Sequence, residues 1–197
     1  MKLVKLFLVA CLLICTAAVA EAQNGRGYRN GSRNGNNICP RLAASFVQQP
    51  LSAEEAAKLL FMREEEKLSM DVYQALYQKW QVRIFDNIAA SEKRHFDALG
   101  TLIVRYELSD PAKSTHGEFT DPDLQKLYTD LHAKGMLSFL DALEVGVAIE
   151  EKDIDDLKDA ISVTDNKDIL MVYGNLMNGS LSHLAAFNSH LEISGKN

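Results

Sequence analysis

Hydrophobic residues recur at helical spacing along most of the chain from residue 51 onward. A capping box, Ser52 with Glu55 three residues later, opens the first stretch, and apolar positions then continue to Trp80. A second stretch over about residues 83–106 follows a very short connection and predicts an adjacent antiparallel helix. The sequence shows no sustained strand alternation, so the pattern predicts an all-α fold.

The next segment breaks this pattern. Residues 107–121 contain a proline and a glycine and show no helical periodicity. Asp121 and Pro122 then supply a cap and a first helical residue for a short helix that ends near Gly135. A connection of roughly 30 residues can carry the chain back along a helical bundle, so a third long helix can start at the same end as the second.

Two further long helices are predicted over about residues 136–161 and 166–193, the last with Thr164 or Asp165 as its cap. A simple up-down-up-down arrangement would not need the long connection before them. Residues 51–193 are therefore predicted to form a four-helix bundle with one long crossover that carries a short extra helix.

Residues 1–22 have the pattern of a cleaved secretory signal. Lys2 and Lys5 accompany an apolar run from Leu6 to Val19, and Ala20-Glu21-Ala22 provides the small-x-small cleavage pattern. The run is shorter than the ~20 residues of a membrane span. We expect a secreted or periplasmic protein without membrane association after cleavage; a membrane anchor and lipidation at Cys11 are the alternatives.

Residues 23–50 are rich in Asn, Gly and Arg toward their start and predict a disordered leader and linker. The alternative is that this segment binds an anionic surface, for which its three dispersed arginines are a weak signal. After signal cleavage Cys39 is the sole cysteine in the sequence. It can be a free thiol, an intermolecular bridge or a small apolar residue, and the sequence leaves these open.

The composition narrows the class of protein. The chain has 197 residues, 47% hydrophobic and 24% charged, with a formal net charge of −6. This charge offers no broad basic surface for nucleic acid, and three cysteines do not make a cysteine-ligated zinc module. A chain of this length buries enough surface to fold without a metal, so any metal site must be argued from particular residues.

Acidic residues and histidines occur on the predicted buried faces of all four long helices. Glu66 shares a face with core residues of the first helix, and Glu92 and His95 do so on the second. Glu150 is in register with apolar positions of the third helix, and His183 with those of the fourth. Burying several carboxylates together costs several kcal/mol each, and a pair of divalent metal ions would offset that cost.

The alternative is that these carboxylates lie at the edge of the bundle and are simply solvated. Nearby basic residues point mostly away from the same faces and are poor counterions: Arg63, Lys67, Lys93, Arg94 and Lys152. Glu65 is the rival to Glu66, and a spacing of seven residues to Tyr73 favours Glu66.

Four segments carry a family resemblance: REEEKLSMDVY, NIAASEKRH, AIEEKDIDDL and GSLSHLAAF. They resemble the ligand series of the ferritin-like diiron-carboxylate superfamily, of the rubrerythrin type, and the secreted ferritin-like domains of unknown function of the DUF2202 type. The resemblance spans about residues 51–191. It implies Tyr73 as a hydrogen-bond donor beside the metal and six ligands: Glu66, Glu92, His95, Glu150, Asp153 and His183.

One position departs from that pattern. Ser180 stands three residues before His183, where the superfamily has a glutamate. Either Asp153 and Glu151 substitute from the neighbouring helix, or one metal position is weak or empty. The departure leaves the predicted fold intact and bears on whether a dinuclear oxidase would be fully active.

Imidazole with carboxylate favours iron, manganese or zinc over magnesium and calcium. With two iron ions the expected activity is that of a ferroxidase or peroxidase, with dioxygen or peroxide as the small oxidant. No Cys-rich electron-transfer module accompanies it in the sequence. The alternative is a non-catalytic binding or interaction module with a structural metal or none, whose acidic run Glu150 to Asp159 is a solvated face. A homo-oligomer is left open.

Overall fold

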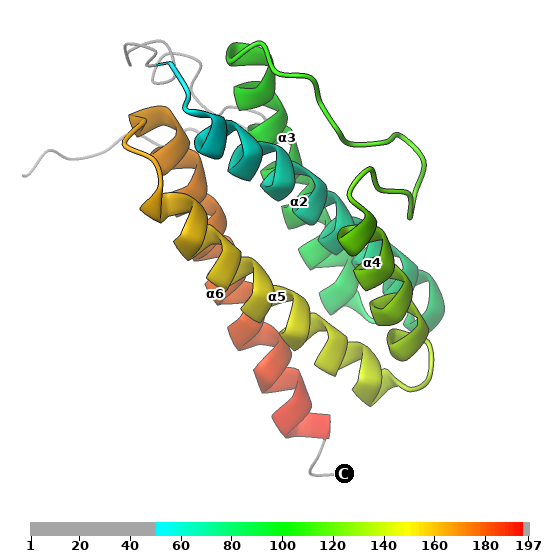
Figure 1. The fold of residues 1–197 in the computed structure, drawn as a ribbon. Coiled ribbons are helices and arrows are strands. Elements are labelled where there is room, and N and C mark those ends of the chain that lie inside the picture. Colours follow the sequence, from blue (N-terminus) through cyan, green and yellow to red (C-terminus); the bar gives the residue numbers. More distant parts are fainter. Residues whose placement is uncertain (1–49, 195–197) are drawn as a thin grey trace, which may run out of the picture. The chain divides into compact units, whose positions relative to one another are not determined.

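A computed structural model describes residues 50–194, and every regular element among these residues is an α-helix (Figure 1). The helices are α2 (Ala53–Trp80), α3 (Arg83–Arg105), α4 (Pro122–Gly135), α5 (Phe139–Ser162) and α6 (Lys167–Ser194). The predicted all-α class is confirmed. The predictions about the signal, the leader up to residue 49 and Cys39 lie outside the described residues.

Two antiparallel hairpins, α2 with α3 and α5 with α6, make up the bundle (Figure 1). The tight turn between α2 and α3 places Gln81 in the left-handed region, at φ 55°. Phe139 at the start of α5 packs against Trp80 and Phe85, with ring centroids 6.3 Å apart in both pairs. The third long helix therefore starts at the same end as the second, as the long crossover predicted. Within residues 50–194, no helix is long and apolar enough to cross a membrane.

Two helix starts differ from prediction. The helix expected from Met136 begins at Phe139, because Ser138 accepts a hydrogen bond from the Asp141 N–H while Met136 still closes α4 with a bond to His132. The last helix begins at Lys167, so neither Thr164 nor Asp165 is the residue that immediately precedes it.

The reason for the second difference is that the α5–α6 turn has another partner. Thr164 and Asn166 both donate side-chain hydrogen bonds to Oε1 of Glu55, at 2.5 and 2.7 Å, and Glu55 also belongs to the capping box of α2. The turn is thus tied to the first helix of the other hairpin.

The crossover covers the outer face of α2 and accounts for a run of buried charges there. Glu64 accepts from the backbone N–H groups of Thr120 and Asp121, at 2.6 and 3.0 Å. Lys67 donates to Asp71 at 2.5 Å and to a crossover carbonyl at 2.9 Å. These charged side chains are satisfied away from the bundle interior, as predicted for the basic residues of this helix.

The hydrophobic core consists of two clusters, one toward each end of the bundle. The first, which we call the α2-start cluster, includes Leu59, Met62, Leu99, Leu157 and Leu176. The second, which we call the aromatic cluster, includes Tyr73, Leu76, Phe85, Leu143 and Phe187. On every long helix the predicted metal ligands lie between the residues of these two clusters, and so the core is interrupted at mid-height by a polar layer.

Candidate metal centre

The polar layer receives side chains from all four long helices. The carboxylates are almost fully buried: Glu66 is 1% exposed, Glu92 2%, Glu150 1% and Asp153 4%. The side chains of His95 and His183 are each 12% exposed. Each residue lies one helical turn or so from apolar core residues of its own helix, so the same periodicity that buries the clusters also buries these groups.

Glu92 lies at the centre of the layer, between the two histidines. Its Oε2 is 2.7 Å from Nδ1 of His95, and its Oε1 is 2.7 Å from Nδ1 of His183. Oε2 of Glu66 is 3.4 Å from the His95 nitrogen, and Oε2 of Glu150 is 3.5 Å from the His183 nitrogen. The result is two groups of three potential ligands that share Glu92, each with its ligand atoms within 4.8 Å of one another.

Several atoms of this layer are buried without a hydrogen-bond partner. They include both carboxylate oxygens of Glu66, Oε1 of Glu92 and Nδ1 of both histidines. The imidazole nitrogens are close to carboxylate oxygens, yet a proton in the ring plane does not point along these contacts as a hydrogen bond requires. A divalent cation shared by these converging nitrogen and oxygen atoms would satisfy them, so the residues present fit a divalent metal.

Tyr73 donates a hydrogen bond to one of the carboxylates of the layer. Its hydroxyl donates to Oε1 of Glu150 at 2.6 Å and lies 3.3 Å from the carbonyl of Gly146. This leaves Oε2 of Glu150 facing His183. Burial, and then the negative charge of Glu150, raise the pKa of Tyr73 well above its usual value, so the phenol stays protonated and able to donate.

The structure separates the two residues proposed to compensate for Ser180. Asp153 is buried, and its Oδ2 receives the Ser180 hydroxyl, which also lies 3.0 Å from the Leu176 carbonyl. Glu151 is exposed, so the suggestion that it substitutes from the neighbouring helix is wrong. It points out because it follows Glu150 directly on α5, a rotation of about 100° away from the interior. A carboxylate from α5 thus faces the position that a fourth-helix glutamate would fill.

Glu65 and Glu66 have different surroundings. Glu66 faces His95, whereas Oε1 of Glu65 is 2.7 Å from Nζ of Lys152, outside the two groups of three ligands. The preference for Glu66 agrees with this geometry. Of the acidic run that starts at Glu150, Glu151, Asp155 and Asp159 are exposed, as predicted for a solvated face, whereas Asp153 is not.

Gly179 is a residue of this site that the sequence reasoning missed. A Cβ atom there would lie 2.5 Å from Cε1 and 2.7 Å from Nε2 of His95. The absence of a side chain on α6 therefore gives the His95 ring its place beside His183, with ring centroids 5.9 Å apart. Its position directly before Ser180 was the available signal, because a helical glycine otherwise costs stability.

The charges of the layer shift one another's pKa. Burial alone would raise the pKa of Glu92, but the contacts with His183 and His95 lower it to about 2. Burial raises the pKa of Glu150 to about 8 and that of Asp153 to about 6. Burial, together with the charges of Asp153 and Glu92, raises the pKa of Glu66 well above its usual value. One carboxylate of the metal-free layer is well compensated, and the others are not.

Burial would lower the pKa of His183, but the contacts with Glu150 and Glu92 raise it to about 10. In the metal-free protein this imidazole is therefore cationic at neutral pH, and it supplies part of the missing positive charge. Metal binding at its Nδ1 would require that proton to leave.

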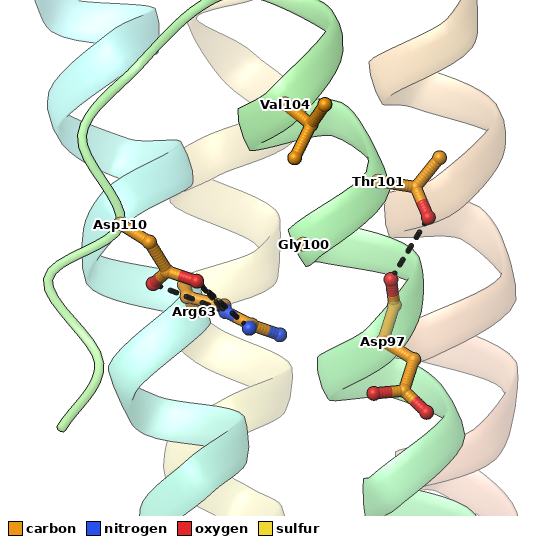
Figure 2. A pocket seen from close by; sticks show the side chains of 6 residues that line it. All are labelled: Arg63, Asp97, Gly100, Thr101, Val104 and Asp110. Carbon is orange, nitrogen blue, oxygen red and sulfur yellow. Dashed lines mark hydrogen bonds and ion pairs between the residues drawn. The ribbon is translucent and has the colours of Figure 1, made fainter. Parts of the chain in front are cut away.

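A surface pocket of about 390 Å³ lies elsewhere, between α2, α3 and the start of the crossover (Figure 2). Figure 2 shows Arg63 reaching Asp110, with Nε and Nη2 at 3.1 and 2.8 Å from Oδ2. Asp97 is paired with Lys93 at 2.6 Å. None of the residues that line this pocket has a buried side-chain polar atom without a partner, so it does not compete with the polar layer as a candidate site.

Comparisons with known proteins place the chain among domains without an assigned activity. A family model described as "Uncharacterized protein domain (DUF2202)" matches residues 55–197. The uncharacterized protein MJ0754 of Methanocaldococcus jannaschii is 48% identical over 155 residues, which are 78% of this chain and 84% of that protein.

Two solved structures are similar in fold. The crystal structure of hypothetical protein MJ0754 from Methanococcus jannaschii matches with a TM-score of 0.75 and 49% identity, over 77% of this chain and 87% of that one. A DUF305 fragment from Deinococcus radiodurans matches with a TM-score of 0.54 over 73% of this chain and 99% of that one. At 9% identity, the second likeness concerns the fold alone.

Proposed function

We propose that this chain, which belongs to the DUF2202 family of uncharacterized domains, is a metal-binding protein whose polar layer holds up to two transition-metal ions, iron first among them. The observation that carries the proposal is the state of Glu66. Both oxygens of this carboxylate are buried without a partner, next to an imidazole nitrogen that also has none. A buried carboxylate without compensation costs several kcal/mol, and a divalent cation between these atoms would compensate it.

A closed network of ion pairs accounts for less of the geometry. Protonated histidines would compensate Glu92, which lies 2.7 Å from both imidazoles. They would leave Glu66 without a hydrogen-bond donor, and Oδ1 of Asp153 as well. A network of ion pairs would therefore leave buried oxygens without partners. A bound metal ion would satisfy more of them.

Within this proposal each residue has a definite task. Glu92 lies where one carboxylate can reach both metal positions, with Glu66 and His95 on one side and Glu150 and His183 on the other. Tyr73 orients Glu150, and Ser180 orients Asp153. Hydrogen bonds of this kind fix the direction of a ligand and tune its affinity.

The donor set of imidazole and carboxylate suits iron, manganese or zinc. Iron bound there would supply redox chemistry toward a small oxidant such as dioxygen or peroxide, and we propose a ferroxidase or peroxidase activity on that basis. The apolar clusters on both sides of the layer restrict water, and the Tyr73 hydroxyl holds a proton 2.6 Å from Glu150. The secretory pattern of residues 1–22 supports a secreted or periplasmic location as part of the same proposal.

The second candidate function is a non-catalytic helical module in which a metal, if bound, only joins the two hairpins. The contacts of Glu92 with the two histidines favour it, because they compensate the charge of this carboxylate without an ion. A redox assay distinguishes the two, since both predict metal binding but only the first predicts turnover.

The test is to purify the protein without chelators, measure its metals by elemental analysis, and titrate the metal-free form anaerobically with Fe²⁺, Mn²⁺ and Zn²⁺. We expect roughly one to two ions per chain, and loss of binding in Glu66→Gln. Glu144→Gln, at an exposed glutamate paired with Lys134, is the matched control and should bind as wild type. Protein that is isolated without metal and fails to bind any of the three ions would refute the proposal.

A further inference from the structure

Glu65 is a buried carboxylate that the metal centre does not use. Its side chain is 3% exposed, and its Oε1 is 2.7 Å from Nζ of Lys152. Its Oε2 has no hydrogen-bond partner, and the same is true of Oδ1 of Asp153. Asp153 follows Lys152 directly on α5, so the contact of Lys152 with Glu65 brings the two carboxylates to the same level of the interface between α2 and α5.

Lys152 connects this buried carboxylate to the surface. Its side chain is 36% exposed and contacts both Glu65 and Asp156, whose side chain is 24% exposed. Its ammonium also lies 5.0 Å from the centre of the Phe61 ring. Lys152 and Asp156 are therefore the outer charged groups, and the buried Glu65 and Asp153 lie farther inward.

The ammonium group has room to move. Lys152, Glu65 and Ser69 contribute to the lining of a cavity of about 60 Å³ between α2, α4 and α5, whose other walls are apolar. A cavity of this size exceeds the space that one water molecule needs. Displacement of the ammonium would leave two buried carboxylates with free oxygens, an arrangement that a divalent cation satisfies better than one ammonium does.

We propose that Glu65 is a transit position for divalent cations, at which an incoming ion displaces the Lys152 ammonium and then passes along Asp153 to Glu66. Lys152 acts as a removable plug that compensates Glu65 while no ion is present. This inference rests on the proposed metal centre and adds the route by which the centre is filled. The competing route runs past His95 and His183, whose side chains are partly exposed on the other side of the layer.

The experiment measures the rate of metal loading separately from its extent. Metal-free protein is mixed with Co²⁺ in a stopped-flow instrument, and the ligand-field absorbance reports binding without any turnover. Glu65→Gln should load about tenfold more slowly, because the negative charge that draws the cation inward is gone. Lys152→Met should load several-fold faster, because no ammonium has to be displaced. The final absorbance and the equilibrium affinity should equal those of wild type in both.

Two matched controls change the same charges at sites away from the route. Glu151→Gln removes an exposed carboxylate next to Lys152 in the sequence. Lys126→Met breaks the exposed Lys126–Asp130 pair on α4, which has the same spacing as Lys152 and Asp156. Both controls should load at the wild-type rate. If either matched the corresponding route variant, the effect would be one of general charge and the transit position would be refuted.

The double variant Glu65→Gln with Lys152→Met tests whether the two residues act at one step. If Lys152 only plugs Glu65, the double variant should load as slowly as Glu65→Gln alone. Wild-type loading rates in both single variants, at full stoichiometry, would overturn the inference while the metal centre stands. If wild type itself showed no cobalt absorbance, the failure would lie with the proposed function. Thermal melting of each variant verifies folding, and the opposite directions expected for the two single variants cannot both arise from unfolding.

Discussion

The two ends of the bundle and its middle layer are built on opposite principles. At the ends, fully buried side chains such as Leu59, Leu76 and Phe85 pack against one another. Each contributes roughly 1.5–3 kcal/mol through removal of apolar surface from water. In the middle, Glu66 and its neighbours are as deeply buried but leave carboxylate oxygens and imidazole nitrogens without partners. The apolar clusters at the ends therefore stabilise the fold. The polar layer does not, so its residues need a functional explanation.

The same contrast holds at the interface between the two hairpins. The apolar clusters draw residues from both hairpins, and so does the polar layer. Without a metal ion, the layer places like charges at the centre of this interface. With a metal ion bound, it contributes metal–ligand bonds instead. We therefore expect mutations at the ends to act on folding whether or not metal is present, and mutations in the layer to act mainly on the metal-loaded form.

Phe187→Ala, in the aromatic cluster, should have the largest effect on the free energy of unfolding. Phe187 is fully buried, packs on Gly146, and lies 5.4 and 6.0 Å from the ring centroids of Tyr73 and Phe85. Its truncation should lower the free energy of unfolding by about 3–5 kcal/mol with and without metal. Chemical denaturation measures this, and Leu181→Ala, at a half-exposed position of the same helix, should change it by less than about 0.5 kcal/mol. A loss confined to the metal-loaded form would erase the distinction between end and layer.

Glu66→Gln in the layer should give the opposite pattern. The isosteric amide replaces a buried carboxyl group that could ionise only without compensation, so the metal-free protein should unfold at the same or a higher denaturant concentration. Metal affinity should fall by at least about 100-fold, or roughly 2.7 kcal/mol. Calorimetric titration and denaturation of the same samples provide both numbers. A large loss of stability in the metal-free variant would mean that Glu66 is part of a structural network.

The pH dependence of the metal-free protein should come from the layer. Asp153, Glu150 and His183 have folded pKa values of about 6, 8 and 10, above their usual 3.8, 4.5 and 6.5. Groups with raised pKa stabilise the fold below their unfolded values and lose that contribution as the pH rises through the folded values. The melting temperature should therefore fall between pH 5 and pH 9, by about 10 °C or more.

Metal should reverse that trend, because ligands bind the ion in their deprotonated forms and affinity rises with pH. The measurement is a melting curve at each pH with and without a saturating metal. The gap between the two melting temperatures should widen toward high pH. A metal-free protein whose melting temperature is constant or rises over this range would contradict the assignment of uncompensated carboxylates to the layer.

Ser180→Ala should have the smallest of these effects. It removes the hydroxyl that contacts Oδ2 of Asp153, so the carboxylate loses its fixed orientation. Supporting hydrogen bonds of this kind typically tune metal affinity by about tenfold or more, and we expect the lower figure because Asp153 belongs to neither of the two groups of three ligands. Ser182→Ala, at an exposed serine on the same helix, is the control in the same titration. Equal affinities in both variants would show that Asp153 needs no support.

The sequence was sufficient to predict the long helices and which face of each helix is buried. Helical periodicity predicted the bundle and its crossover, and it placed Glu66, Glu92, Glu150 and His183 inside because a residue in register with buried neighbours is itself buried. Helical periodicity could not predict the contacts between helices. Periodicity has no information on which side chain of another helix lies opposite, so the fit of His95 against Gly179 went unpredicted.

The buried charges on α2 illustrate the same limit. The sequence predicted that Arg63 and Lys67 point away from the ligand faces, but it did not predict that they and Glu64 are buried by the crossover, which contacts all three. The pairing of Lys152 with Glu65 also depends on how α2 and α5 approach each other. Helix ends failed for a related reason, since the start of α6 is set by the bonds of Thr164 and Asn166 to Glu55, more than a hundred residues earlier in the chain.

The most direct test of the central claim is anomalous X-ray diffraction from crystals grown from protein loaded anaerobically with iron, collected on both sides of the iron absorption edge. We predict an anomalous peak between Glu66, Glu92 and His95, and a second between Glu92, Glu150 and His183, with Nδ1 of each histidine facing its peak. A map with no peak in the layer, or with iron bound only at surface carboxylates, would contradict the account and leave the layer as a network of ion pairs.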